Sequence, residues 1–420
     1  AEVSRAAGQL RFYGDVAAQG SYLAATIDYP TSTAPGLARV NQPLGPVAVF
    51  GASNFPFAFG VLGNDFGSAL AAGCPVITKS HPAHPLLSDR LAGLARKALL
   101  GAGAPKGSFD IVVGYDAGVA LVRDEGVAAL AFTGSQAAGL ALWRIANERR
   151  TVIPTYAEMS TVNPVVVTRA AAATRMEEIA EGFVGSFTLG SGQFCTKPGL
   201  VFVPAGTAAV DTIGKALRRA SLDPVMLTEA IAKSTAQGVE DLMVSGARVV
   251  ELVEASVEGW SAPAAVLEAR IDALQDGSRL LEECFGAVAV VVEYADIAEL
   301  AAAVGRLQGS LAASVFTADE DDPDAAACLA LLSPKVGRLC ANDWPTGVAY
   351  TWAQQHGGPW PSTSAPSATS VGAAALDRFV RPVTYQSLRD EWLPPALQAA
   401  NPWNLSRRVN GALQPRGATQ

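Results

Sequence analysis

The stretch that decides the fold is "PVAVF", residues 46–50, which runs directly into the turn "GASNFP", residues 51–56. A short apolar run that ends in a glycine-containing turn is typical of a strand buried on both faces of a parallel sheet. A helical segment is expected next, over about 57–72. This order of strand, turn and helix predicts the first crossover unit of an α/β domain.

The same alternation continues along the chain. The first half should contain four further strands, at "CPVITK" (74–79), "FDIVVG" (109–114), "AALAFTGS" (128–135) and "TVIPTYAE" (151–158), with a helix over about 85–100. A helix over 175–187 opens a second series, with strands at "LVFVP" (200–204), "ARVVELV" (247–253), "AVAVVVEY" (287–294) and "AASVFT" (312–317). Two α/β domains are therefore predicted, the first a candidate for nucleotide binding. From about residue 346 the chain is rich in Gly, Pro, Ser and Trp, which indicates an irregular segment.

Composition excludes several functional classes. Lys and Arg number 31 against 39 Asp and Glu, a net charge of −8, and no basic run is present, so nucleic acid is not expected as a partner. No apolar stretch approaches the roughly 20 residues that span a bilayer. The N-terminus has no signal peptide and resembles the middle of a helix, which suggests that the sequence begins inside a domain. A cytoplasmic protein is expected.

The five cysteines are scattered, with no CxxC pair and no Cys/His cluster, so a reducing compartment and no metal site are expected. Cys195 stands out because "SGQFCTKPG" (191–199) surrounds it with glycines directly after a predicted helix. It is either an inert packing thiol or a nucleophile, and the motif alone favours the inert thiol. The three histidines, His81, His84 and His356, offer few partners, so a nucleophile here is expected to rely on another base.

Two further polar residues follow predicted strands, where ligands gather in α/β folds. Asn54 is either a turn-forming residue or a donor to an oxyanion. Glu158 is either a solvated surface carboxylate or a general base. The "FTGS" turn before a helix is a ready phosphate site, and Lys79 lies just past a strand.

Together these features resemble the aldehyde dehydrogenase superfamily over nearly the whole chain. The matching segments, in order, are "SNFPFAFGVLGNDFGSALAAGCPVITK" (53–79), "FTGS" (132–135), "AEMSTVNPVVV" (157–167), "GSGQFCTKPG" (190–199) and "LLEECFG" (280–286). The resemblance implies a Rossmann-type cofactor domain, an α/β catalytic domain and a small β oligomerisation segment. The domain limits that it suggests are 1–160 for the cofactor domain with an inserted hairpin at 25–43, 161–380 for the catalytic domain, and 381–420 for the oligomerisation segment and tail.

The resemblance also implies a role for each matching residue. Cys195 would be the nucleophile, Asn54 the oxyanion donor and Glu158 the base that activates the thiol or the hydrolytic water. The implied cofactor-binding residues are Lys79, His81, Phe132, Gly134, Ser135, Glu283 and Phe285. The implied reaction is oxidation of an aldehyde through a thiohemiacetal and a thioester on Cys195.

Departures from the common family pattern narrow the resemblance. Met159, Ser160 and Thr161 stand where many members have Leu-Gly-Gly, and Ala287 stands where proline is usual. With "TKSHPAHP" (78–85) and "RFVRPVTYQSLRDEWLPPAL" (378–397), they are most similar to the branch of 2-ketoglutaric semialdehyde (2,5-dioxopentanoate) dehydrogenases. The acidic residue that NAD-specific members place three positions after the lysine is replaced by Pro82, so NADP is expected to be preferred, with NAD possible.

Several alternatives stay open. An acidic substrate needs an arginine or hydroxyls, for which Arg381 or the Ser/Thr set at 362–370 are candidates, whereas a fatty aldehyde needs an apolar tunnel, for which Phe55, Phe59, Trp352 and Trp360 are candidates. A CoA-dependent relative and a catalytically silent structural or binding member are the other hypotheses; Glu158 argues against the first and the full set of site residues against the second. The 25–43 and 381–388 regions resemble segments that pair across subunits, so a homodimer or homotetramer is expected.

Overall fold

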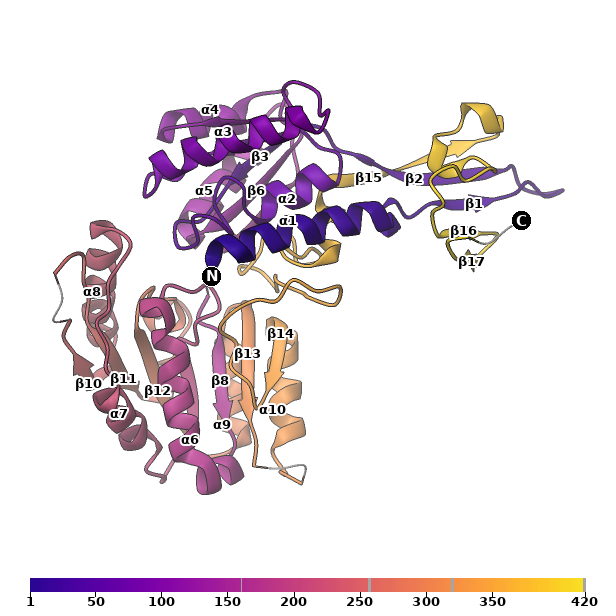
Figure 1. Ribbon diagram of the computed structural model, residues 1–420. Helices are drawn as coiled ribbons and strands as arrows, with labels where there is room; N and C mark the ends of the chain where they lie inside the picture. The colour runs from indigo at the N-terminus through magenta and orange to yellow at the C-terminus, as the bar shows by residue number, and fades with distance from the viewer. Residues whose placement is uncertain (160, 256–257, 319–320, 418–420) are drawn as a thin grey trace.

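The protein is described by a computed structural model over residues 1–159, 161–255, 258–318 and 321–417 (Figure 1). Ser160, one of the departures noted above, lies outside the described residues. Three sheets organise the chain, two of them largely parallel and covered by helices. The α/β class predicted from the sequence is therefore confirmed.

The first parallel sheet has the strand order β5-β4-β3-β6-β7. Its strands are β3 (Val47–Phe50), β4 (Val76–Lys79), β5 (Phe109–Val112), β6 (Ala129–Gly134) and β7 (Thr155–Met159). One face packs against α1 (Glu2–Gln19), α2 (Asn64–Ala71) and α3 (Pro85–Gly101), and the other against α4 (Tyr115–Arg123) and α5 (Gln136–Asn147). All five predicted strands are confirmed, and their carboxyl ends carry Lys79, Gly134 and Glu158.

The helix predicted over 57–72 is wrong in its first half, because α2 begins only at Asn64. Residues before it form a tight loop in which Gly60 and Gly63 approach neighbouring backbone. A Cβ at Gly60 would lie 2.1 Å from the carbonyl oxygen of Pro56, and one at Gly63 would lie 2.6 Å from the Cα of Phe59. These close approaches hold the Asn54 loop in a compact turn over the end of β3.

The second sheet has the order β10-β11-β12-β9-β8-β13-β14, parallel except for the edge strand β10. Its strands are β8 (Pro164–Val167), β9 (Leu200–Pro204), β10 (Arg248–Val253), β11 (Ala264–Ala269), β12 (Val288–Tyr294), β13 (Ser310–Phe316) and β14 (Val336–Ala341). Its helices are α6 (Arg169–Thr188), α7 (Ala209–Arg219), α8 (Glu229–Val244), α9 (Ile297–Arg306) and α10 (Ala325–Leu332). The predicted helix over 175–187 is confirmed within α6, whose Ile179, Phe183 and Phe187 are buried.

The third sheet, of order β15-β2-β1-β16-β17, extends away from the two larger units (Figure 1). Its strands are β1 (Thr26–Asp28), β2 (Leu37–Pro43), β15 (Val380–Gln386), β16 (Arg407–Val409) and β17 (Ala412–Gln414). The segment before β15, η6 (Ala373–Phe379), packs in the apolar core around β3 and α2. This end of the range 161–380 therefore packs with the first unit and not with the second sheet.

In the described part of the chain, no helix combines the length and the apolar character needed to cross a bilayer. The irregular backbone predicted from about residue 346 is confirmed as far as Gly372, apart from one isolated bridge between Thr363 and Glu158. Beyond it the prediction is wrong, because β15, β16 and β17 belong to the third sheet. The irregular segment carries His356 and Ser370 from the second unit back toward the end of β7.

Candidate active site

The loop that carries Cys195 is held in an unusual backbone path. After α6, three successive residues adopt left-handed conformations: Gly190 (φ 57°), Ser191 (φ 58°) and Gly192 (φ 70°). A Cβ at Gly192 would lie 2.1 Å from the carbonyl carbon of Gly286, so only glycine allows this loop to reach the "EECFG" segment. The glycines that drew attention in the sequence therefore set the position of Cys195.

Asn163 holds the same loop by hydrogen bonds to its backbone. Its Nδ2 donates to the carbonyl oxygens of Cys195 (2.8 Å) and Lys197 (3.0 Å), and its Oδ1 accepts from the N–H of Ala312 (3.1 Å). Asn163 is fully buried, with φ 49°, a conformation that asparagine tolerates better than most residues. Asn163 lies in the segment "AEMSTVNPVVV" (157–167), but the sequence alone predicted no role for it. Its only signal there was an Asn-Pro pair beside the Glu158 motif.

Asn54 lies against the Cys195 loop, as its proposed role requires. Its Nδ2 donates to the carbonyl oxygen of Gln193 over 2.7 Å. Phe55, the next residue, packs its ring edge-on against Phe194, with centroids 4.9 Å apart. An asparagine amide has two N–H donors. One of them holds the Cys195 loop through the carbonyl oxygen of Gln193.

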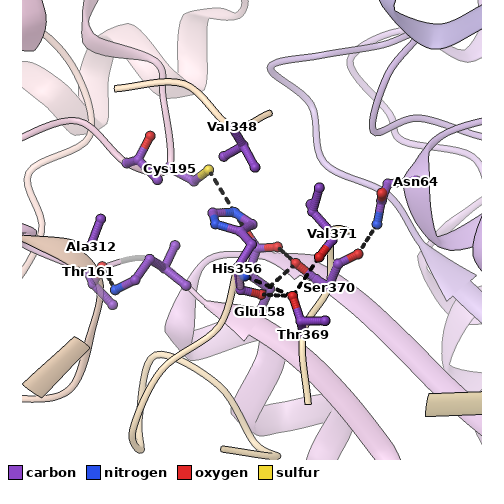
Figure 2. Close-up of polar contacts among 12 residues, drawn as sticks. Asn64, Glu158, Thr161, Cys195, Ala312, Val348, His356, Thr369, Ser370 and Val371 are labelled. Atoms are coloured by element: carbon purple, nitrogen blue, oxygen red, sulfur yellow. Dashed lines mark hydrogen bonds and ion pairs between the residues drawn. The ribbon is translucent and has the colours of Figure 1, made fainter. Parts of the chain in front are cut away.

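Glu158, near the end of β7, is a buried carboxylate with a hydrogen-bond donor on each oxygen (Figure 2). Only 4 % of the residue is exposed, Oε1 lies 2.9 Å from Nε2 of His356, and Oε2 accepts from the hydroxyl of Ser370. Burial opposes the charged form, but His356 and Ser370 outweigh burial, so the pKa of Glu158 is held below its usual value. Glu158 is thus poised as an ionised base inside the protein, and the surface alternative is wrong.

His356 is the functional residue that the sequence analysis missed. Its Nε2 lies 3.6 Å from Sγ of Cys195, so one ring nitrogen faces both the thiol and the Glu158 carboxylate (Figure 2). The side chain is buried, and Nδ1 has no hydrogen-bond partner in the described chain. The sequence predicted that a nucleophile would do without a histidine. The one available signal was a rare histidine beside a glycine pair, in "QHGGP" (354–358).

Cys195 is half-buried, and the two groups that it faces are fully buried. Burial of the thiol and the nearby charge of Glu158 both raise the pKa of Cys195 well above its usual value. The thiol therefore stays protonated beside an ionised Glu158, and activation needs a proton to leave the sulfur.

The same three residues offer ligand atoms of the kind that bind zinc, namely a thiol, an imidazole and a carboxylate. Their ligand atoms all lie within 4.8 Å of one another. Histidines that hold metals usually donate from their second ring nitrogen, which His356 Nδ1 does not do in the described chain. We interpret the cluster as one that exchanges protons.

The predicted cofactor residues occupy the carboxyl ends of the first sheet. Lys79 ends β4, and Gly134 ends β6. Ser135 is the N-cap of α5, and its hydroxyl accepts from the N–H of Ala138 (3.4 Å). A helix N-terminus beside a lysine suits the phosphates of a dinucleotide. Phe132 is only 7 % exposed and packs in the core with Met159, so its ring supports Gly134 from beneath.

His81 follows β4 and stacks near His84, with ring centroids 5.5 Å apart. Burial, with the nearby charges of His84 and Lys79, lowers the pKa of His81 to about 4. His81 is therefore neutral near pH 7 and can offer a phosphate a hydrogen bond but no charge. The positive charge on this side of the site comes from Lys79.

Glu283 lies across the boundary between the two units, in a pocket of about 110 Å³. The pocket is lined by Gln136, Thr161, Val162, Leu281, Glu282, Glu283, Gln308, Gly309 and Ser310. Gln136 from α5 donates to Gln308 over 3.3 Å, so the start of α5 and the "EECFG" segment face one cleft. The carbonyl oxygen of Phe285 accepts from Thr235 (2.7 Å), which fixes this segment beside the Cys195 loop.

Comparisons with known proteins show what this chain is similar to. A model of the aldehyde dehydrogenase family matches residues 1–382. "Alpha-ketoglutaric semialdehyde dehydrogenase 2" of Azospirillum brasilense is 43% identical over 98% of this chain and 80% of its own length. "Alpha-ketoglutaric semialdehyde dehydrogenase" of Acinetobacter baylyi is 38% identical over the same shares. Among solved structures, an aldehyde dehydrogenase of Bacillus cereus superimposes with a TM-score of 0.75 at 22% identity, covering 92% of this chain and 76% of its own.

Proposed function

Because the chain belongs to the aldehyde dehydrogenase family, whose members oxidise aldehydes with NAD(P), we propose that it oxidises 2-ketoglutaric semialdehyde to 2-ketoglutarate. The observation that carries the chemistry is the position of His356 Nε2 between Cys195 Sγ and Glu158 Oε1. The substrate is proposed from the names of the two relatives that match almost all of this chain.

The three side chains can generate a thiolate by a local proton exchange. Glu158 accepts the proton of the Cys195 thiol, so the negative charge moves from the carboxylate to the sulfur. A hydrogen on His356 Nε2 can donate to Glu158 before this step and to the thiolate after it, because the same nitrogen faces both atoms. His356 thus stabilises the charge at either place without itself losing or gaining a proton.

The thiolate then adds to the aldehyde carbon. Addition turns the carbonyl oxygen into an oxyanion, which the second N–H of Asn54 and the backbone N–H of Cys195 would stabilise. Lys79 and Ser135 would hold the adenosine side of the dinucleotide, and Glu283 and Phe285 the nicotinamide side. The nicotinamide, when bound there, would supply the acceptor for the hydride that leaves the thiohemiacetal. Cys195 is then left as an uncharged thioester.

Hydrolysis of the thioester again depends on Glu158. Glu158, protonated when the thiolate formed, first releases that proton to solvent and is then ionised again, held by His356 and Ser370. A water molecule between Glu158 and the thioester would give its proton to the carboxylate and attack the acyl carbon, and the carbon–sulfur bond would then break to release the acid and return the Cys195 thiolate. A buried base beside the nucleophile favours water as the acceptor over coenzyme A.

We also propose that NADP is preferred over NAD. Pro82 leaves no carboxylate three residues after Lys79 to repel a 2′-phosphate, and Lys79 supplies a positive charge at the end of β4. The neutral His81 adds at most a hydrogen bond.

The fatty aldehyde alternative has weaker support. Of the four aromatic residues considered for an apolar tunnel, Phe55 and Phe59 lie near the Cys195 loop. Trp352 and Trp360 are about half exposed and pack against Phe12 and Trp143. Two of these four aromatic residues therefore support an apolar tunnel at the Cys195 loop, and the two tryptophans do not.

A dimer or tetramer is proposed through the third sheet. β2 and β15 pair with each other in a sheet that extends from the body of the subunit (Figure 1). Sedimentation of the purified chain at micromolar concentration should give a species larger than one subunit. A monomer as the sole species would contradict this proposal.

The test of the function is the formation of NADPH and NADH with 2-ketoglutaric semialdehyde, a short aliphatic aldehyde and a long-chain aldehyde. Cys195→Ala should abolish turnover. Cys340→Ala is the matched control, because Cys340 is a half-buried free thiol on β14. Turnover that survives Cys195→Ala, or a wild-type protein without turnover on any aldehyde, would contradict the proposal. Adding coenzyme A would separate the acyl-transfer alternative from a silent protein.

A further inference from the structure

Arg5, in the first turns of α1, places a guanidinium group beside the active site. The group lies over the rings of Phe55, Phe59 and Tyr350, at 5.4, 5.6 and 5.7 Å from their centroids. Phe55 in turn contacts Phe194, the residue before Cys195. Phe55 and Phe194 therefore connect the Arg5 guanidinium to the residue next to Cys195.

The charge of Arg5 acts on the nucleophile itself. Although burial and Glu158 keep the pKa of Cys195 raised, Arg5 is the nearby group that works in the opposite direction. The aromatic contacts and this electrostatic effect both show that the guanidinium lies close to Cys195.

This charge has no partner among the described residues. None of the ion pairs in the described part of the chain includes Arg5, so no described carboxylate lies within 4.0 Å of its guanidinium nitrogens. Glu2, one turn away on α1, uses Oε1 to accept from the N–H groups of Phe57 (2.8 Å) and Ala58 (3.1 Å). Arg5 itself donates to the carbonyl oxygen of Val348 at the long distance of 3.4 Å. Its other contacts are with the aromatic residues Phe55, Phe59 and Tyr350, which carry no charge to neutralise the guanidinium.

The other groups considered for an acidic substrate are used elsewhere. Arg381 is an exposed residue of β15 and pairs with Gln42 in the third sheet. Four of the six hydroxyl groups of the 362–370 segment donate to neighbours within the fold. They are Ser362 to Pro359, Ser364 to Thr155, Thr369 to Val371 and Ser370 to Glu158. Arg5 is thus a better candidate for binding the carboxylate of an acidic substrate than Arg381 or these four hydroxyl groups.

We propose that Arg5 binds the carboxylate of a keto-acid aldehyde while the aldehyde carbon lies at Cys195. This inference rests on the proposed oxidation of 2-ketoglutaric semialdehyde. In that molecule four carbon–carbon bonds of about 1.5 Å separate the two ends, so they are about 5 Å apart when extended. A chain of this length passes across the rings of Phe55 and Phe59, and its carboxylate meets the fork of N–H donors on Arg5.

The experiment compares Arg5→Met, Arg5→Lys and wild type on 2-ketoglutaric semialdehyde and on pentanal, which has the same number of carbons and no charge. Methionine keeps the packing of the side chain against the aromatic rings. Arg11→Met is the matched control, because Arg11 is an exposed arginine on the same helix. Inhibition by 2-ketoglutarate with pentanal as substrate gives a second readout.

Arg5→Met should lower kcat/KM for the semialdehyde by roughly 10- to 100-fold, mainly through KM, and leave pentanal within about twofold. It should also weaken inhibition by 2-ketoglutarate by a similar factor, and Arg5→Lys should recover part of both effects. Equal losses on both substrates, or no loss on either, would overturn the role of Arg5 while the proposed function stands. A wild-type protein that oxidises pentanal but not the semialdehyde would overturn the proposed substrate, and this inference with it.

Discussion

Glu158 and His356 are 198 residues apart in the sequence and face each other across 2.9 Å inside the protein. Glu158 ends a strand of the first sheet, whereas His356 belongs to the irregular segment that returns from the second. Their contact therefore forms only when both units have folded and docked. It leaves the Cys195 thiol facing a base that already has its hydrogen-bond donors in place.

The first prediction concerns His356 as the donor that stabilises the thiolate. His356→Ala should lower kcat by about 100-fold, the order of effect seen when one donor to a developing charge is removed. It should also slow alkylation of Cys195 by iodoacetamide, because the thiolate loses the N–H that faces it. Both quantities are measured on the purified variant.

His356→Gln is the informative second variant, because a glutamine amide can present an N–H from a similar distance. It should recover part of the alkylation rate. His81→Gln is the histidine control and should leave alkylation unchanged, since His81 lies beyond β4. An alkylation rate that His356→Ala leaves at the wild-type value would show that the thiol is activated without this histidine.

The second prediction uses the Ser370 hydroxyl, which donates to Glu158 Oε2. This bond is one of the causes that hold the pKa of Glu158 below its usual value, so removing it should raise that pKa. Activity needs ionised Glu158 and is lost as pH falls through its pKa. Ser370→Ala should therefore move the acidic limb of the profile of kcat/KM against pH to higher pH.

The control for Ser370 is Ser362→Ala, a buried serine in the same segment that donates to Pro359 and not to Glu158. Its acidic limb should coincide with that of the wild type. A Ser370→Ala profile that falls in height at every pH without moving would indicate a loss of folded enzyme instead of a change at Glu158.

The third prediction concerns Lys79, one of the two basic residues predicted to bind the cofactor; the other is His81. Lys79→Met should raise KM for NADP by about tenfold or more and change KM for NAD much less, because a charged contact to the 2′-phosphate is lost. Lys106→Met, at an exposed lysine of the same unit, is the matched control. Equal effects on the two cofactors would remove the basis for the NADP preference.

His81 should contribute no charge in the working pH range. Its pKa of about 4 means that it gains a proton only in strong acid, so KM for NADP should not fall as the pH is lowered from 8 to 6. His81→Gln should give the same pH dependence as wild type. A fall in KM toward pH 6 that disappears in His81→Gln would contradict the neutral imidazole.

The sequence predicted the strands of the first sheet and the residues at their carboxyl ends, because short apolar runs closed by turns carry a strong local signal. It missed β11, "AAVLEA", whose Ala, Leu and Glu favour helix. That segment becomes a strand because it lies in the sheet between β10 and β12, where five of its six residues are buried. The local sequence pattern of residues 264–269 does not reveal these neighbours, so the strand could not be predicted from it.

The residues of the candidate site also fall into those that the sequence predicted and those that it did not. Cys195, Asn54 and Glu158 lie in compact motifs that the sequence displays. His356 and Arg5 lie in segments with no motif, and each reaches the site through contacts over a long separation in the chain. Arg5, for example, meets Val348 from 343 residues away. Their roles follow only from the distances that the fold creates.

The last prediction concerns the ion pair beneath the active site. Arg378 donates to Asp65 over 2.8 Å, and both side chains are almost fully buried. The same nitrogen also reaches the carbonyl oxygen of Ser370 (3.3 Å), so the pair supports the residue that holds Glu158. Asn64 donates to that carbonyl as well and accepts from the hydroxyl of Tyr13. A buried network thus links α1 and α2 to the catalytic carboxylate.

Arg378→Met should lower the free energy of unfolding by about 3–5 kcal/mol, because Asp65 would remain buried without its partner. Adding Asp65→Asn to this variant removes the uncompensated charge and should recover part of the loss. Urea unfolding measures both, with Arg389→Gln as control, since Arg389 forms an exposed pair with Glu391 whose loss should change little. A double variant that is less stable than Arg378→Met would mean that Asp65 stabilises the fold through contacts other than Arg378.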